Sequence, residues 1–391
     1  MKQIALLRTV MLIMILVIFV FAVGFSQAGE WSALGSGTNG QVLALAVSES
    51  GVIYAGGSFT TAGGAAANRV AMWNGTSWLP LGDGILNGTV YALVIDSSGN
   101  LYAGGNFNAA GTVTANKIAK WDGSEWSAVG PVDYPGISDG SAVRALVVDS
   151  SDNLYIGGEF EKIVYGILQE LTVNNIVMWN DTGWHTLGLG LNDDVHALVC
   201  DNADNLYAGG YFTTADGTGV NHLAQWNGTT WSDVGGGING YVWSLAYGGS
   251  NLYAGGRFQS AGTAPVYANN IICWDGSAWN QLESGANDDV KSLTLDGTNL
   301  YAAGDFSSVG SVSASYIAKW NGTVWSALDS GTNSDVYAVA RIDTGSITAG
   351  GAFTQAGEAV VSNIARWDEP SSGGTATAMP WLNLLLLNQG E

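Results

Sequence analysis

Short apolar runs alternate with clusters of small and polar residues along most of this chain. Within residues 90–129, the apolar runs lie at 90–95, 101–107, 116–121 and 126–129. Asp, Ser, Gly and Asn fill the gaps, and the last gap contains Asp122-Gly123, a pair that favours a tight hairpin turn. The pattern predicts four antiparallel strands, and no stretch after residue 28 shows the period of a helix.

This four-strand pattern occurs seven times, at intervals of about 48 residues. Each copy has a Gly-Gly-x-Phe turn after its second run and a pair of Trp residues around the last turn, except that Ala303 replaces the first Gly of the sixth copy. Repeats of about 40 to 50 residues with strand-like content are typical of β-propellers. The first Trp of each pair is Trp73, Trp121, Trp179, Trp226, Trp274, Trp320 and Trp367.

The predicted strands are apolar on both faces. Val90, Ala92 and Val94 lie on one face of a strand whose other face carries Leu93 and Ile95. A sheet of this kind must be covered on both faces, and packing blades around an axis achieves this. We therefore predict an all-β, seven-bladed β-propeller of four-stranded antiparallel blades. The paired Trp, the Phe and the Gly-Gly positions are interpreted as scaffold.

The repeats begin and end in the middle of a blade. The segment Trp31 to Leu34 matches a fourth run but precedes the first copy, whereas the seventh copy stops after its third run, at Trp367. We predict that the N-terminal strand Trp31 to Leu34 joins the last blade and closes the ring.

The two ends of the chain differ from the repeats. Lys2 and Arg8 precede an apolar run, and Ser26 to Ala28 supplies small residues for cleavage, so residues 1–28 are predicted to be a signal peptide. An uncleaved membrane anchor is the alternative. Residues 29–369 are predicted to form the propeller, and residues 370–391 a flexible linker with a short apolar tail. We expect a protein that is secreted, extracellular or at the cell surface, with the periplasm as an alternative and no stable membrane span after cleavage.

The chain is strongly acidic. Its formal charge of −21 becomes −23 without residues 1–28, because that segment holds two basic residues, Lys2 and Arg8, and no acidic one. Such a surface repels phosphate backbones, so no nucleic acid is expected as a partner, and it favours a soluble monomer. Cys200 and Cys273 lie in different copies, and two free thiols are favoured over a disulfide.

The repeat resembles a known family. Gly56-Gly57, then Trp73, then Trp78 followed by Leu79-Pro80-Leu81-Gly82, resembles the kelch-type repeat, with Trp where that repeat has Tyr and with a shorter turn. It is more similar to secreted bacterial repeats of the delta-60 type and to the propeller of fungal cortical cell-polarity markers. The resemblance covers about residues 31–369 and implies a propeller, without implying a function.

Galactose oxidase, a copper enzyme with a kelch-type propeller, raises the question of catalysis. Its site needs a Tyr cross-linked to Cys and several His ligands, but this chain has only His185, His196 and His222, and no Cys in a matching position. No metal or cofactor is therefore expected. A carbohydrate-active or other hydrolytic enzyme is the alternative function, and its candidate carboxylates are Asp193, Asp194, Asp288, Asp289 and Asp335. Their recurrence as Asn-Asp-Asp favours turn chemistry instead.

The favoured function is a non-enzymatic module that binds a carbohydrate or an extracellular protein. In a propeller the longer connections emerge on one face, where binding residues concentrate. The second residue of each predicted inner strand varies widely and would lie at the channel mouth on that face, where aromatic rings and cations suit a sugar or a carboxylate. The alternative is that these side chains pack between blades or plug the channel. Besides Leu43, the predicted ring consists of Tyr91, Arg144, His196, Trp243, Lys291 and Tyr337.

The third copy is longer than the others, and its extra residues form a second candidate site. They fall within 131–140 and 161–173, in the two connections that are expected on the loop face. A neutral insertion is the alternative interpretation. The predicted patch consists of Asp133, Tyr134, Glu161, Lys162 and Tyr165, with Glu170 beside them.

Overall fold

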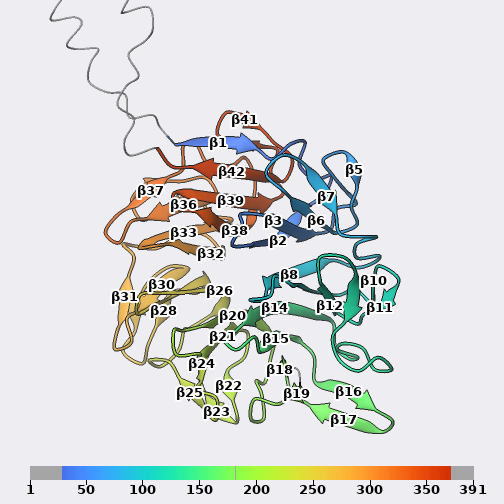
Figure 1. Cartoon of the computed structure of the whole chain (residues 1–391). Helices are drawn as coiled ribbons and strands as arrows, with labels where there is room; N and C mark the ends of the chain where they lie inside the picture. The colour runs from blue at the N-terminus through green and yellow to red at the C-terminus, as the bar shows by residue number, and fades with distance from the viewer. Residues whose placement is uncertain (1–28, 181, 371–391) are drawn as a thin grey trace, which may run out of the picture. The chain divides into compact units, whose positions relative to one another are not determined.

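Seven four-stranded antiparallel sheets surround a common axis in the computed structural model, which describes residues 29–180 and 182–370 (Figure 1). The first strand of each blade contacts the first strand of the next, and β38 contacts β2, so the ring is closed. The predicted all-β, seven-bladed propeller is therefore confirmed. The first strands are β2 (Val42–Val47), β8 (Val90–Ile95), β14 (Ala142–Val148), β20 (Val195–Cys200), β26 (Tyr241–Gly248), β32 (Val290–Asp296) and β38 (Val336–Asp343).

The other strands of each blade follow outward in chain order. The second strands are β3 (Ile53–Gly57), β9 (Leu101–Gly105), β15 (Leu154–Glu159), β21 (Leu206–Gly210), β27 (Asn251–Arg257), β33 (Asn299–Gly304) and β39 (Ser346–Gly351). The third strands are β6 (Val70–Trp73), β12 (Ile118–Trp121), β18 (Ile176–Asn180), β24 (Leu223–Trp226), β30 (Ile271–Trp274), β36 (Ile317–Trp320) and β42 (Ile364–Asp368). The outer strands are β7 (Trp78–Pro80), β13 (Trp126–Ala128), β19 (Gly183–His185), β25 (Trp231–Asp233), β31 (Trp279–Gln281), β37 (Trp325–Ala327) and β1 (Glu30–Ala33).

The N-terminal strand β1 completes the last blade, as predicted. It pairs with β42, so strands from the two ends of the repeat region share one sheet (Figure 1). The Trp31 ring lies 5.4 Å from the Trp367 ring, and the Trp31 indole N–H donates to the Leu328 carbonyl oxygen. The same contacts that hold the other blades together therefore also join the two ends of the ring.

The connection between the second and third strands is more ordered than the sequence suggested. In every blade it folds into a small hairpin, which the sequence pattern did not predict. An Asn or Asp from the preceding connection accepts its backbone N–H groups, as Asn39 does from Thr60 and Thr61. The hairpins are β4 (Thr61–Ala62) with β5 (Ala65–Ala66), β10 (Ala109–Ala110) with β11 (Val113–Thr114), β16 (Lys162–Gly166) with β17 (Gln169–Thr172), β22 (Thr214–Ala215) with β23 (Thr218–Gly219), β28 (Ser260–Ala261) with β29 (Val266–Tyr267), β34 (Ser308–Val309) with β35 (Val312–Ser313), and β40 (Gln355–Ala356) with β41 (Ala359–Val360).

Both long connections lie on the same face of the propeller. An isolated bridge joins the connection from the preceding blade to the hairpin in six blades, as between Thr38 and Ala62 in the first. Within the described residues, the third blade has no such bridge. The loop face therefore exists as predicted, and the third blade departs from the common arrangement on it.

Buried aromatic side chains form the core between neighbouring blades. The seven Phe residues of the Gly-Gly-x-Phe turns are all buried, and the two Trp rings of each pair lie 4.8 to 5.6 Å apart. Cys200 and Cys273 are free thiols, and burial raises their pKa values to about 12 and about 11. The scaffold interpretation of the Trp and Phe positions is consistent with this burial.

The outer Trp of each blade, with one exception, links that blade to the preceding one by a hydrogen bond. In six blades its indole N–H donates to a carbonyl oxygen at the exit of the preceding blade, as Trp126 does to Leu81 at 2.8 Å. The buried Trp184 Nε1 of the third blade has no hydrogen-bond partner within the described residues. A lengthened connection, residues 131–140, follows the place where its acceptor would stand.

This exception gives a matched pair of substitutions. We expect Trp126→Phe to lower the free energy of unfolding by about 1 kcal/mol more than Trp184→Phe, because only Trp126 loses a hydrogen bond. Thermal melts of the two variants measure the difference. Equal losses would show that the indole N–H of Trp126 contributes nothing measurable.

The predicted leader, residues 1–28, and the tail from residue 371 lie outside the described residues, so the boundaries of leader, propeller and tail remain predictions. Residues Trp31–Asp368 form one compact unit. In the described part of the chain, no helix has the length and apolar character that crossing a bilayer requires.

Candidate functional site

The residues of the predicted ring converge because every inner strand bulges at the same place. The pairing of the first and second strands shifts register around the ring residue in all seven blades, for example between Val143 and Ala145 on either side of Arg144. A β-bulge leaves one residue out of the ladder and redirects its side chain. All six predicted residues, together with Leu43, line one hollow on the axis with a volume of about 260 Å³.

A second tier of side chains stands beside this ring. It comes from the variable position of the Gly-Gly-x-Phe turn, to which the sequence analysis assigned no role. In the third to sixth blades this residue contacts the ring residue of its own blade. The four pairs are Arg144 with Glu159, His196 with Tyr211, Trp243 with Arg257, and Lys291 with Asp305. The signal was present in the sequence, because the same position is Ser58, Asn106 and Ala352 in the remaining blades.

The two ring cations are held between carboxylates and aromatic faces. The Arg144 guanidinium lies 4.9 Å from the centre of the Tyr91 ring and 3.9 Å from a Glu159 oxygen. The Lys291 Nζ lies 4.7 Å from the centre of the Tyr337 ring and 2.5 Å from an Asp305 oxygen. These contacts fix each cation in one place, since opposite charges and aromatic faces both attract it.

Aromatic rings line the side of the mouth formed by the fourth and fifth blades. The His196 ring stacks on Tyr211 at 4.5 Å, and Tyr211 in turn lies 4.3 Å from Tyr241. The Trp243 Nε1 donates to the Tyr211 hydroxyl oxygen at 3.3 Å. Arg257 lies over the Trp243 ring at 5.4 Å. Tyr211, Tyr241 and Arg257 are site residues that the sequence analysis missed.

Arg144 Nε and His196 Nε2, both buried, have neither a hydrogen-bond nor an ion-pair partner within the described residues, whereas Asp305 Oδ1 lacks a hydrogen bond but is paired with Lys291. Burial lowers the pKa of His196 to about 4, and the nearby Arg144 adds to the effect, so the imidazole is neutral at physiological pH. An unpaired buried polar atom costs about 1 to 3 kcal/mol. Such atoms in neighbouring blades are suited to meet the polar groups of a bound molecule.

The charge around the mouth is negative despite the cations. Besides Glu159 and Asp305, it includes Asp335, whose carboxylate lies 3.9 Å from Lys291 Nζ and accepts a hydrogen bond from the Tyr337 hydroxyl. The Arg257 Nε donates to the buried Asp289 at 2.7 Å. Because each cation already has a carboxylate partner, the mouth favours a neutral ligand over the carboxylate-bearing ligand also considered from the sequence.

The remaining candidate carboxylates separate into two groups. Asp288 Oδ1 accepts the backbone N–H of Asp289, and Asp193 Oδ1 accepts that of Asp194, which is the turn chemistry expected from their recurrence. Asp194 differs because burial, and then its carboxylate neighbours Glu159 and Asp193, raise its pKa. It lines a hollow of about 320 Å³ with Asp139, Glu159, Glu161 and Asp193.

The residues of the predicted blade 3 patch occupy two separate segments. Glu161, Lys162 and Tyr165 lie on or beside the β16–β17 hairpin, where Lys162 Nζ pairs with Glu170 at 3.0 Å. Asp133 and Tyr134 lie in the connection before β14. Asp139 Oδ1 of this connection accepts the backbone N–H groups of Glu161 and Lys162, and Ser138 Oγ accepts that of Val164, so hydrogen bonds join the two segments. None of these bonds involves Asp133 or Tyr134.

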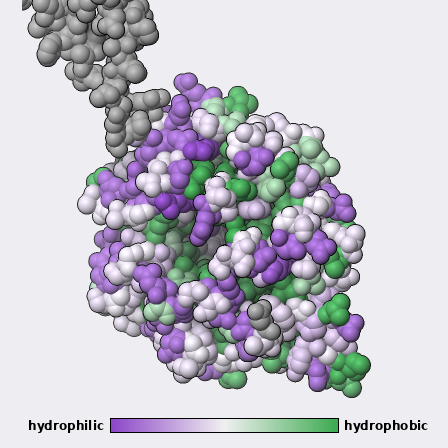
Figure 2. All heavy atoms as spheres, viewed as in Figure 1, coloured by the Kyte–Doolittle hydropathy of each residue, from purple (hydrophilic) through white to green (hydrophobic). Residues whose placement is uncertain are grey.

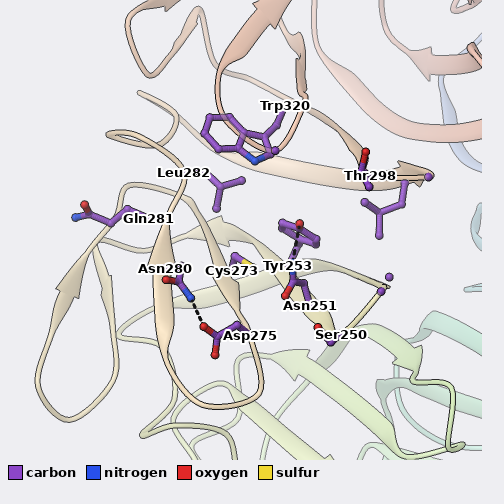
Figure 3. Close-up of a pocket in the computed structure, with 15 residues that line it drawn as sticks. Ser250, Asn251, Tyr253, Cys273, Asp275, Asn280, Gln281, Leu282, Thr298 and Trp320 are labelled. Carbon is purple, nitrogen blue, oxygen red and sulfur yellow. Dashed lines mark hydrogen bonds between the residues drawn. The ribbon is translucent and has the colours of Figure 1, made fainter.

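A larger hollow, of about 440 Å³, lies between the fifth and sixth blades (Figure 3). Its carboxylate and amide side chains already have partners: Asp275 accepts hydrogen bonds from Ser277, Ala278 and Asn280. Asn251 donates to the Tyr253 hydroxyl oxygen at 3.4 Å. The side chains that would hold a ligand are thus committed to the turns, and we do not assign a site here.

Comparisons with known proteins agree on the fold. A family model described as the Rax2 C-terminal beta propeller domain matches residues 171–347, which is less than half of the chain. The WD40 β-propeller domain of Doa1 is similar with a TM-score of 0.59 at 14% identity, over 88% of this chain and 98% of that one. The comparison with curated protein sequences gave no match.

Other solved structures with the same fold differ widely in description. The extracellular domain of a putative hybrid two component system from B. thetaiotaomicron has a TM-score of 0.55 at 15% identity, over 87% of this chain; the match spans 39% of that domain's length. Streptogramin B lyase has a TM-score of 0.52 at 12% identity, over 87% of this chain and 97% of that one. Likeness at such identities shows the propeller fold alone, so function has to be argued from the site.

Proposed function

We propose that this chain is a secreted, non-enzymatic binding module that holds a neutral carbohydrate at the mouth of its central channel. The observation that carries the proposal is the convergence of seven bulged ring residues, four of which are paired with a residue from the Gly-Gly-x-Phe turn. The pairs vary between blades while the scaffold around them repeats. Variation confined to one end of the channel is typical of a binding surface.

The chemistry of the mouth supports a sugar. Carbohydrates present apolar C–H faces that stack on aromatic rings, and hydroxyls that both donate and accept hydrogen bonds. Tyr91, Trp243 and Tyr337 supply rings, while the Arg144–Glu159 and Lys291–Asp305 pairs supply donors and acceptors side by side. The hollow of about 260 Å³ is smaller than the roughly 300 to 1,000 Å³ of pockets for drug-sized ligands. It suits a single sugar unit or the end of a longer chain.

We further infer that the repeat is a divergent relative of the kelch-like and delta-60-type repeats. The Gly doublet and the paired Trp residues support this relationship. The signal peptide predicted over residues 1–28 supports secretion.

A glycan array and isothermal titration calorimetry test the proposed function. We expect the chain beginning at Gly29 to bind a subset of neutral glycans, and Trp243→Ala combined with Lys291→Ala to weaken that binding about 100-fold, since two central contacts are lost. Ser58→Ala, at the variable position of the first blade, is the matched control and should bind normally. Unchanged affinity in the double variant, with its thermal melt intact, would reject the ring as the site.

A hydrolytic function is the second candidate, and the raised pKa of Asp194 is the observation that favours it. A carboxyl whose pKa is raised, beside a second carboxyl group, is the arrangement that glycoside hydrolysis uses. Mass spectrometry of the same glycans after incubation distinguishes the two functions. Shortened glycans that disappear with Asp194→Asn would establish hydrolysis, and intact glycans would favour binding alone.

A further inference from the structure

The hairpin of the third blade extends beyond those of the other blades. Its strands β16 and β17 have five and four residues, whereas every other hairpin strand has two. Its tip exposes Ile167 and Leu168, which are 82% and 99% accessible, and Figure 2 shows apolar side chains at this outer end. Nothing in the propeller covers them.

The two tip residues are unusual for a turn. Leu168 has a φ of 58°, a left-handed conformation that Gly or Asn adopts far more readily than Leu. An Asn-Gly pair would form the same turn with less strain and without exposing apolar surface. The fold therefore does not explain this pair, whereas contact with a partner does.

An aromatic hollow lies at the base of the hairpin. Tyr165, Leu171, Trp179 and Trp184 line it together with Pro131, and its volume is about 500 Å³. Trp184 is the outer Trp without an indole hydrogen bond within the described residues, and it is less buried than its six counterparts. The third blade thus lacks the indole hydrogen bond to the preceding blade that the other blades have, and its Trp179–Trp184 pair lines a hollow at its outer edge.

The charged residues near this hollow favour a basic partner over an anionic one. The two segments that contribute Pro131, Tyr165 and Leu171 to its lining, residues 131–140 and 161–173, carry four carboxylates, Asp133, Asp139, Glu161 and Glu170, against one base, Lys162, which is paired with Glu170. An anionic membrane would be repelled by this excess of carboxylates, whereas basic residues flanking an apolar segment would be attracted. Aromatic-lined grooves favour extended segments that contain proline, since these lose little conformational freedom on binding.

We propose that the rim of the third blade docks an extended, proline-containing apolar segment of a partner protein, flanked by basic residues. An apolar side chain of the segment enters the hollow between Tyr165 and the Trp179–Trp184 pair. Ile167 and Leu168 cover the segment from the hairpin side. This site is separate from the channel mouth and does not depend on the proposed carbohydrate binding.

Synthetic peptides test this docking directly. The probes are fluorescent 12-residue peptides with a Leu- and Pro-rich centre, flanked by lysines in one panel and by glutamates in the other, together with vesicles of neutral or anionic phospholipid. We expect lysine-flanked peptides to bind the chain beginning at Gly29 with micromolar affinity, and glutamate-flanked peptides to bind at least 10-fold more weakly. Fluorescence anisotropy measures both.

Two variants locate the site without disturbing the fold. I167N combined with L168G installs the favoured turn pair, and Tyr165→Ala removes one wall of the hollow; each should weaken peptide binding about 10-fold or more. Val360→Asn is the matched control, because Val360 is 84% accessible on the equivalent hairpin of the seventh blade.

Three results would overturn the proposal. The first is absence of peptide binding, and the second is equal binding by the hairpin variants and the control. The third is a different occupant, shown either by vesicle binding or by a dimer that the I167N and L168G changes dissociate. Glycan binding should be unchanged in the hairpin variants, so a failure here is distinguishable from a failure of the channel site.

Discussion

A chain that begins at Leu34 and so lacks β1 is expected to melt about 10 °C or more below a chain that begins at Gly29. The loss removes Trp31, which is 7% accessible, packs at a tilt against the Trp367 ring and donates a hydrogen bond to the Leu328 carbonyl oxygen. Replacing a buried Trp by Ala already costs about 3 to 5 kcal/mol, and each kcal/mol lowers the melting temperature by about 2 to 4 °C in domains of 150 to 250 residues. Differential scanning calorimetry measures the shift.

Removal of β1 also uncovers the edge of β42, whose backbone groups then face solvent. An unpaired edge promotes association between chains, so the shortened protein should aggregate at concentrations where the longer one is monomeric. Trp31→Ala in the longer chain separates the two effects, because it removes the packing but keeps the strand. Equal melting temperatures for all three proteins would contradict closure of the ring by β1.

Gly105→Ala is expected to be among the most destabilising single substitutions in the chain, at about 4 kcal/mol or more. An added Cβ at Gly105 would collide with the carbonyl oxygen of Thr89, the residue just before the neighbouring strand β8, and backbone atoms cannot move aside without separating the strands. Losses of this size are rare and signal a steric conflict of this kind. Thermal melts and the yield of folded protein report the effect.

Gly104→Ala is the matched comparison and should cost about 1 to 3 kcal/mol, the usual range for overpacking. An added Cβ there meets the Val143 side chain of the next blade, which has some freedom to adjust. The sixth blade already carries Ala303 at this position, fully buried, opposite the seventh blade. A larger loss for Gly104→Ala than for Gly105→Ala would contradict this account.

The architecture could be predicted from the sequence because its determinants are periodic. A Trp pair and a buried Phe recur in each copy. Trp31 precedes the first copy, whereas the seventh copy lacks a fourth strand, so Trp31 matches the missing strand of the last blade. The ring residues could also be predicted, since variation at one position of a repeated strand indicates a surface that the scaffold does not use. The points where the repeats begin and end, and the positions that differ among the copies, can both be read from the sequence.

Other features of the site depend on geometry that the sequence does not display. The bulge in each inner strand arises from a shift in pairing between two strands, and no residue type marks it. The partnership of Tyr211 with His196, or of Asp305 with Lys291, requires knowing that these bulged residues face the Gly-Gly-x-Phe turn of the same blade. The hairpins were missed because their strands have mostly two residues, too few for a pattern to emerge.

The partnership of a ring residue with a turn residue occurs within a single blade in all four cases. In each of these blades, the ring residue and its turn partner therefore lie within one segment of about 15 consecutive residues. Closure of the ring depends on different side chains, the Trp and Phe of the core. Exchange of one such segment would change the binding residues of one blade at the channel mouth and leave closure of the propeller intact. The repeat architecture thus permits ligand specificity to diverge one blade at a time.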